Sequence, residues 1–144
     1  MKEKYQKSLS LTDFPFHHTI QTRWKDMDSF GHVNNAAFLT YFEDARIVFF
    51  ERWKINTESR SLIVASVKMD YHKQLYHPSE MVIGQKISRT GNTSFDINSS
   101  LFIQAESAPF ATVTITCVCY DFILNKSVPV YVEIKEDYKK ILPI

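Results

Sequence analysis

Two carboxylates and a glycine come directly before the longest helix-patterned segment of the chain. Asp26 and Asp28 are followed by Gly31, and then by Asn34 and Asn35. Glycine can adopt a left-handed turn, and asparagine is a favoured helix cap. The first N–H groups of a helix lack intrahelical partners and carry partial positive charge. A carboxylate folded back beside them would supply a base or nucleophile together with polarisation of a carbonyl, which is the chemistry of acyl transfer.

This stretch resembles the 4-hydroxybenzoyl-CoA thioesterase family of the hotdog superfamily. The matching residues run from Arg23 through the Asp-x-Asp-x-x-Gly-His-Val-Asn-Asn core to Ala36, and continue as Tyr-Phe-Glu-Asp-Ala-Arg over 41–46. The resemblance implies that Asp28 is the catalytic carboxylate and that the backbone N–H of Asn35 polarises the thioester carbonyl. It leaves open whether Asp28 attacks the carbonyl directly or activates a water molecule.

The other residues of the motif are expected to support the site loop. We expect Asp26 to be structural, either pairing with a cation or fixing the loop. Gly31 meets a conformational requirement, and His32 either shapes the pocket or hydrogen-bonds the loop backbone. Asn34 and Asn35 are candidates both for helix caps and for side chains that contact substrate, and any catalytic duty there is expected to fall mainly on backbone N–H groups.

The element that must position this loop is a helix predicted over residues 35–53. Apolar residues recur along it at helical spacing and form a stripe: Phe38, Phe42, Ala45, Phe49 and Trp53. Leu39, Tyr41, Val48 and Phe50 widen that stripe. An apolar surface this broad predicts a helix enclosed by other structure on most of its sides.

The rest of the chain alternates as β-strands do. Strands are predicted at about 14–24, 63–71, 81–89, 95–103 and 111–119, with a short helix near 134–141. In the second of them Ile63, Ala65, Val67, Met69 and Tyr71 are predicted to share one face. Tyr71 and the following His72 are candidates for lining the acyl pocket, but they are interpreted as ordinary strand residues.

Consecutive strands with short connections favour an antiparallel sheet, and one dominant helix favours the α+β class. Curling the sheet around the helix is the economical way to bury it. The resemblance, which covers nearly the whole chain, implies the same arrangement, a hotdog fold. Residues 1–144 are therefore interpreted as one domain.

Composition excludes several other classes of protein. With only three glycines, the chain cannot contain a phosphate-binding glycine loop, a dinucleotide-binding fingerprint or a serine-hydrolase elbow. A net charge of +1 with scattered cations argues against nucleic-acid binding. The histidines have no spacing typical of a metal site. Cys117 and Cys119 are expected to be reduced, packed thiols.

We expect a cytoplasmic protein without membrane insertion. The charged start of the chain is not followed by the apolar segment of a signal peptide, and the apolar-rich stretch 110–120 is too short to cross a bilayer.

Hydrolysis of an acyl-CoA, with acyl carrier protein as a possible alternative carrier, is the leading functional hypothesis. Coenzyme A is then part of the substrate, and neither a cofactor nor a metal is implied. The resemblance implies a homodimer or a dimer of dimers with the site at the subunit interface. Two alternatives are a hotdog hydratase or dehydratase that uses His32, and a non-catalytic module that binds acyl thioesters.

Overall fold

The computed structural model describes residues 9–55, 58–103 and 108–141. Its elements in chain order are η1 (Leu11–Asp13), β1 (Phe16–Gln21), η2 (Trp24–Asp26), α2 (Asn35–Glu51), β2 (Arg60–Tyr71), β3 (Glu80–Thr90), β4 (Ser94–Ile103), β5 (Ala111–Asp121), β6 (Lys126–Ser127) and α3 (Val132–Ile141). No helix in these ranges is both long and apolar enough to cross a membrane.

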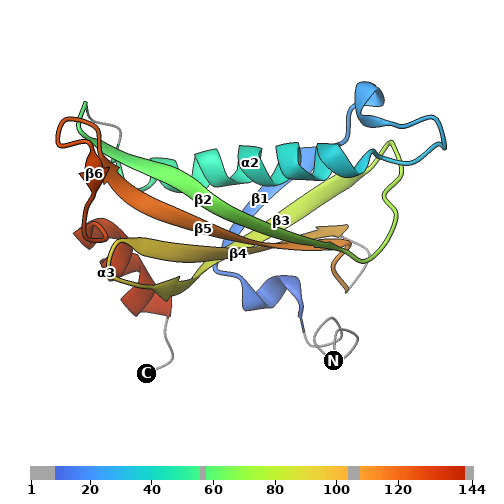
Figure 1. Ribbon diagram of the computed structural model, residues 1–144. Coiled ribbons are helices and arrows are strands. Elements are labelled where there is room, and N and C mark those ends of the chain that lie inside the picture. The colour runs from blue at the N-terminus through green and yellow to red at the C-terminus, as the bar shows by residue number, and fades with distance from the viewer. Residues whose placement is uncertain (1–8, 56–57, 104–107, 142–144) are drawn as a thin grey trace.

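The strands form one antiparallel sheet with the order β1-β3-β4-β5-β2, and β6 pairs with β5. The sheet curls around α2, as Figure 1 shows, and this is the predicted hotdog fold. Strand β2 is the last in the order, so one of its edges pairs with no other described strand.

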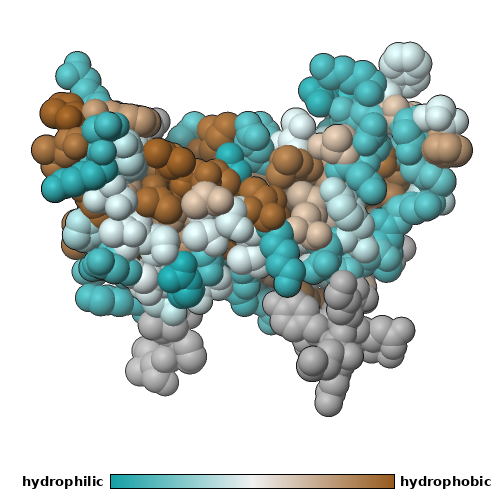
Figure 2. Space-filling model, in the orientation of Figure 1, coloured by the Kyte–Doolittle hydropathy of each residue, from teal (hydrophilic) through white to brown (hydrophobic). Residues whose placement is uncertain are grey.

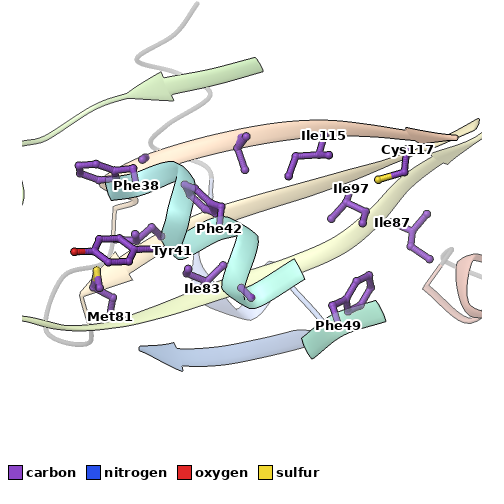
Figure 3. Packing of buried hydrophobic residues seen from close by; sticks show 14 of the residues in the cluster. Phe38, Tyr41, Phe42, Phe49, Met81, Ile83, Ile87, Ile97, Ile115 and Cys117 are labelled. Atoms are coloured by element: carbon purple, nitrogen blue, oxygen red, sulfur yellow. The ribbon is translucent and has the colours of Figure 1, made fainter. Parts of the chain in front are cut away.

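The core lies between α2 and the concave face of the sheet. The predicted helix stripe is confirmed, because Phe38, Phe42, Ala45, Phe49 and Trp53 are each at most 5% exposed. Figure 3 shows side chains of α2 pointing toward Ile83, Ile97 and Ile115 of the sheet. Burying aromatic side chains contributes the largest apolar area per residue, so this interface supplies much of the stability of the fold.

The predicted enclosure of α2 is incomplete. Leu39 and Val48 are 41% and 46% exposed, and Ile47 beside them is 52% exposed. These side chains lie on the part of the helix that the sheet does not cover. Figure 2 shows apolar side chains gathered across the middle of the face where α2 and β2 lie in Figure 1.

Strand β2 departs from the predicted alternation. A bulge between Val64 and Ser66 shifts its register with β5, so that Val64 lies opposite Cys117 and Val67 lies opposite Ile115. Val64 and Val67 therefore lie on the same face of the sheet. The predicted alternation placed Ile63 and Ala65 on that face instead of Val64. A bulge inserts one unpaired residue, and simple alternation cannot anticipate it.

The predicted first strand was too long at both ends. Regular pairing with β3 covers only Phe16–Gln21, and the chain from Trp24 forms a short 3-10 helix in which the Trp24 side chain is 80% exposed. The prediction of reduced, packed thiols is confirmed, since Cys117 and Cys119 are free and buried. Burial raises the pKa of Cys117 to about 12.

The C-terminal helix α3 is joined by polar contacts to the end of α2. Arg52 donates to Asp137 at 2.7 Å, and the indole N–H of Trp53 also donates to this carboxylate. Burial alone would raise the pKa of Asp137, but these two donors outweigh it and lower the pKa.

Candidate active site

The motif forms a tight loop between η2 and α2. Met27 and Val33 make an isolated antiparallel bridge, and the N–H of Asp28 donates to the carbonyl of His32 at 2.7 Å. Gly31 lies at the tip with a φ of +83°, which glycine adopts at no steric cost. The prediction of a left-handed glycine is confirmed, and the loop turns back on itself before the helix begins.

Asp26 ties this loop to the helix. Its carboxylate accepts from the Tyr41 hydroxyl at 2.5 Å and from the Arg23 guanidinium at 2.8 Å, and its carbonyl accepts from the N–H of Asn34 at 2.8 Å. Burial would raise the pKa of Asp26, but the bonds from Arg23 and Tyr41 outweigh it and lower the pKa. Asp26 is 6% exposed and has its hydrogen-bonding capacity engaged, which is the structural arrangement that was predicted.

The start of α2 leaves one backbone donor open. Asn34 is the N-cap, and its side chain accepts from the N–H of Ala36 at 3.0 Å, as predicted. Asn35 is the first helical residue, and its N–H has no hydrogen-bond acceptor within the described ranges. An unpaired N–H at a helix start attracts negative charge on a ligand oxygen.

The carboxylate of Asp28 is held through one oxygen. Its Oδ1 accepts from the N–H of Phe30 at 2.9 Å and from the N–H of His32 at 3.1 Å. No donor among the residues described bonds Oδ2. The loop backbone therefore fixes the orientation of the carboxylate and leaves its second oxygen available to a ligand or a water molecule.

Asp28 and Asn35 both line one cavity of about 660 Å³, a volume within the range of small-molecule sites. It lies where the start of α2, the loop before it and the loop after β2 meet, at the right-hand end of Figure 1. Its full lining is Asp28, Phe30, His32, Val33, Asn34, Asn35, Phe38, Tyr71, His72, Lys73, Gln74 and Leu75.

The second wall of the cavity includes Tyr71 and His72, so their interpretation as ordinary strand residues was wrong and the pocket-lining alternative holds. Tyr71 donates its hydroxyl to the carbonyl of Asn35 at 3.1 Å, and its ring packs edge-on against Phe38 with centroids 5.3 Å apart. His72 bonds the Thr112 hydroxyl at 3.0 Å. Two polar aromatic residues at the end of a strand pattern are a weak signal, and only the curl of the sheet brings them opposite the helix start.

His32 shapes the pocket. Its ring lies against Tyr76 with centroids 4.9 Å apart, while its backbone N–H donates to the carboxylate of Asp28. Within the described ranges the ring bonds neither Asp26 nor Asp28. The histidine–carboxylate pair that a hydratase or dehydratase requires is therefore not assembled from these residues.

The sequence model of the thioesterase-like superfamily matches residues 22–137, which include the motif loop, α2 and all of the sheet except β1. The chain belongs to this superfamily.

Individual proteins are similar to this chain along much of its length. The uncharacterized protein YsmA of Bacillus subtilis is 33% identical over 89 residues, which cover 60% of this chain and 60% of YsmA. The long-chain acyl-CoA thioesterase FadM of Escherichia coli is 22% identical over 128 residues, covering 85% and 96% of the two chains. The crystal structure of PA5185 from Pseudomonas aeruginosa shares the fold, with a TM-score of 0.82, 23% identity and coverage of 92% and 94%.

We expect Asp26→Asn to lower the free energy of unfolding by about 2 kcal/mol, because hydrogen bonds to a buried charged group are lost or weakened. Urea denaturation at neutral pH measures this loss. Asp44→Asn is the matched control, since the Asp44 side chain is 56% exposed and its one ion pair among the described residues is with His18, so its loss should be below about 1 kcal/mol.

The difference in free energy of unfolding between wild type and Asp26→Asn should also depend on pH. The folded-state pKa of Asp26 is lowered, so its stabilisation is complete above its unfolded-state value of about 4 and is lost as the pH falls below it. The stability difference between wild type and Asp26→Asn should therefore shrink on acidification. A difference that grows below pH 4 would contradict this assignment.

Proposed function

We propose that this chain hydrolyses acyl-CoA thioesters, with Asp28 acting at the thioester carbonyl and the N–H of Asn35 stabilising the oxyanion. The proposal is supported by two groups that line the same cavity. One is the carboxylate oxygen of Asp28 that no described donor bonds, and the other is the backbone N–H of Asn35 at the start of α2. Membership of the thioesterase-like superfamily supports the same reaction.

In the proposed reaction, the carbonyl oxygen of the thioester accepts from the N–H of Asn35. Asp28 either attacks the carbonyl carbon or removes a proton from the water that does so. The C–S bond then breaks, and coenzyme A leaves as the thiolate, which takes up a proton. If Asp28 has attacked, an anhydride of Asp28 and the acyl group remains, and water cleaves it to release the acid and restore the carboxylate. Water supplies the oxygen and hydrogen of the product acid, so no metal or cofactor is needed.

The cavity is suited to an amphipathic thioester. Phe30 and Tyr71, which are 82% and 45% exposed, offer apolar contact for an acyl group, and Lys73 brings a positive charge to the same cavity. We expect a small or medium acyl group. Because the similar FadM is named a long-chain acyl-CoA thioesterase, a useful substrate panel runs from acetyl-CoA to palmitoyl-CoA.

Two other functions remain distinguishable by assay. A hydratase or dehydratase would convert an enoyl-CoA without releasing thiol, and the His32 ring makes no carboxylate contact of the kind that reaction needs. A non-catalytic module would bind acyl-CoA esters tightly without hydrolysing them. Retention of a carboxylate with one unbonded oxygen favours hydrolysis over this third function.

We expect Asp28→Asn to lower kcat for thiol release by at least about a hundredfold, because the replacement can neither attack nor accept a proton. Thiol release is followed with a chromogenic thiol reagent in the presence of EDTA. The amide oxygen can still accept the two loop N–H bonds, so the variant should remain folded. Equal activity would show that the chemistry lies on another residue.

Asn35→Pro tests the oxyanion donor separately. Proline is tolerated at the first helical position and has no N–H, and the extended backbone of Asn34 (φ −60°, ψ 137°) suits a residue before proline. We expect kcat to fall by about 10²–10³. The control is Asn35→Ala, which keeps the N–H and should keep most of the activity. Similar losses in both would assign the effect to the side chain instead.

A homodimer joined through β2 is part of the proposal. The unpaired edge of β2 is a template for another strand, and it adjoins an exposed apolar surface formed by Leu39, Ile47 and Val48 of α2 with Val64, Val67 and Tyr71 of β2. A second copy would cover both at once. This pairing explains why so broad an apolar helix leaves one side exposed within a single chain.

We expect Val67→Lys to weaken the dimer, because the charge would be buried at the proposed interface. Sedimentation velocity over a range of concentrations measures the association. Val132→Lys, at a position that is 62% exposed on α3, is the control and should leave the dimer intact. A dimer of unchanged affinity in Val67→Lys would exclude this edge as the interface.

A further inference from the structure

Three large apolar side chains are exposed in the turn between β5 and β6. Phe122, Ile123 and Leu124 are 59%, 72% and 58% exposed, and we call them the apolar tip. Figure 2 shows an apolar cluster at the end of the molecule where this hairpin turns in Figure 1. Turns usually consist of small and polar residues, and contiguous exposed apolar groups mark contact surfaces.

Polar contacts hold the apolar tip in place. The carboxylate of Asp121 accepts from the N–H groups of Ile123 and Leu124 at 2.8 Å and 2.9 Å. Tyr120 donates its hydroxyl to the side chain of Asn125 at 2.7 Å, and Asn125 itself has a left-handed φ of 56°. The turn therefore presents its apolar side chains on an ordered backbone.

The apolar tip lies far from the cavity of its own chain. Arg60 pairs with Asp121, and the N–H of Phe122 donates to the carbonyl of Ser59 at 3.0 Å, so the tip is level with the start of β2. The cavity includes Tyr71 at the end of β2. At about 3.3 Å per residue, the two ends of this strand are roughly 35 Å apart. Figure 1 shows the hairpin turn and the start of α2 at opposite ends of the molecule.

In a dimer paired through β2, the apolar tip of one copy would instead lie near the cavity of the other copy. The most exposed run of β2 is Ile63–Lys68, centred between Ala65 and Ser66. Antiparallel pairing of two β2 edges about that centre sets Val64 opposite Val67 of the second copy, and Arg60 opposite its Tyr71. Arg60 of β2 lies beside Asp121 of β5, and the apolar tip follows Asp121 in the chain. The apolar tip therefore lies about two strand spacings, roughly 10 Å, from that tyrosine.

We infer that the apolar tip of each copy forms part of the wall of the other copy's cavity and contacts the acyl chain bound there. This inference rests on the proposed function and on the β2 interface. The cavity has an open apolar rim that such a contact would extend, since Phe30 and Tyr76 are 82% and 56% exposed. In Figure 1 the hairpin turn bends toward the side of the sheet that carries α2, which is the side of the cavity.

The first test replaces the apolar tip with serines, in the variant Phe122→Ser, Ile123→Ser, Leu124→Ser. Its homodimer should lose about tenfold in kcat/KM for the longest acyl-CoA that the wild type accepts, because apolar contact with the chain is lost. Acetyl-CoA, which has too short a chain for this contact, should be little affected. Val132→Ser, also an exposed apolar residue, is the matched control and should leave both values unchanged.

Mixed dimers decide whether the apolar tip acts across the interface. Pairing an Asp28→Asn chain with a tip-variant chain leaves one intact Asp28 site, faced by an intact tip. We expect the wild-type rate per intact site. Placing both changes in one chain and pairing it with wild type leaves the intact site facing a serine tip, and we expect the tenfold loss. Equal rates from these two mixed dimers would overturn the inference.

Cross-linking tests the contact without relying on activity. Ile123→Cys chains mixed with Gln74→Cys chains should be joined by a short bis-maleimide, whereas Val132→Cys chains mixed with Gln74→Cys chains should not. The native Cys117 and Cys119 are buried and should not react. If the wild type hydrolyses no thioester, the proposed function fails, while this cross-link still decides the contact. Absence of the cross-link, or tip-dependent binding to phosphatidylcholine vesicles with equal mixed-dimer rates, would contradict the inference.

Discussion

The structure depends on one constraint, which is the need to cover the unusually broad apolar surface of α2. A flat sheet would cover only a stripe of such a helix, so the antiparallel sheet curls until its buried residues surround Phe38, Phe42 and Phe49. The dense packing of these aromatic rings makes α2 a fixed axis. The start of this axis, where the N–H of Asn35 is unpaired among the described residues, opens onto the cavity that Asp28 also lines.

The loop of the candidate site depends on the same helix. Tyr41 belongs to the buried surface of α2, yet its hydroxyl reaches Asp26 in the loop, so packing of the core also fixes the loop. Asp26 then holds Asn34 at the cap, and the turn at Gly31 returns the chain so that backbone N–H groups orient Asp28. The two neighbouring carboxylates thus differ in environment. One has its oxygens engaged by Arg23 and Tyr41, and the other keeps an oxygen open to the cavity.

The same constraint links the site to assembly. One sheet cannot close around α2 completely, and the uncovered side of the helix lies beside the unpaired edge of β2. In the proposed dimer, one interface would pair the edge of β2 and cover the exposed apolar side chains of α2. That pairing also brings the β5–β6 turn of one copy to the cavity of the other, so the size of the acyl site would depend on association as well as on the fold.

The fold class, the long helix and the loop that carries Asp28 could all be predicted from the order of the residues. Periodicity reports local facing, and Gly31 and Asn34 are recognisable because their roles are set by backbone conformation within a few residues. Other features could not be predicted in this way. They are the bulge in β2 that places Val64 instead of Ile63 on the face of Val67, and the position of Tyr71 opposite Asn35. The hydrogen bonds from Tyr41 and Arg23 to Asp26 are a further example. These features arise from pairing between distant segments and from the curl of the sheet, and neither is encoded in the spacing of residues along the chain.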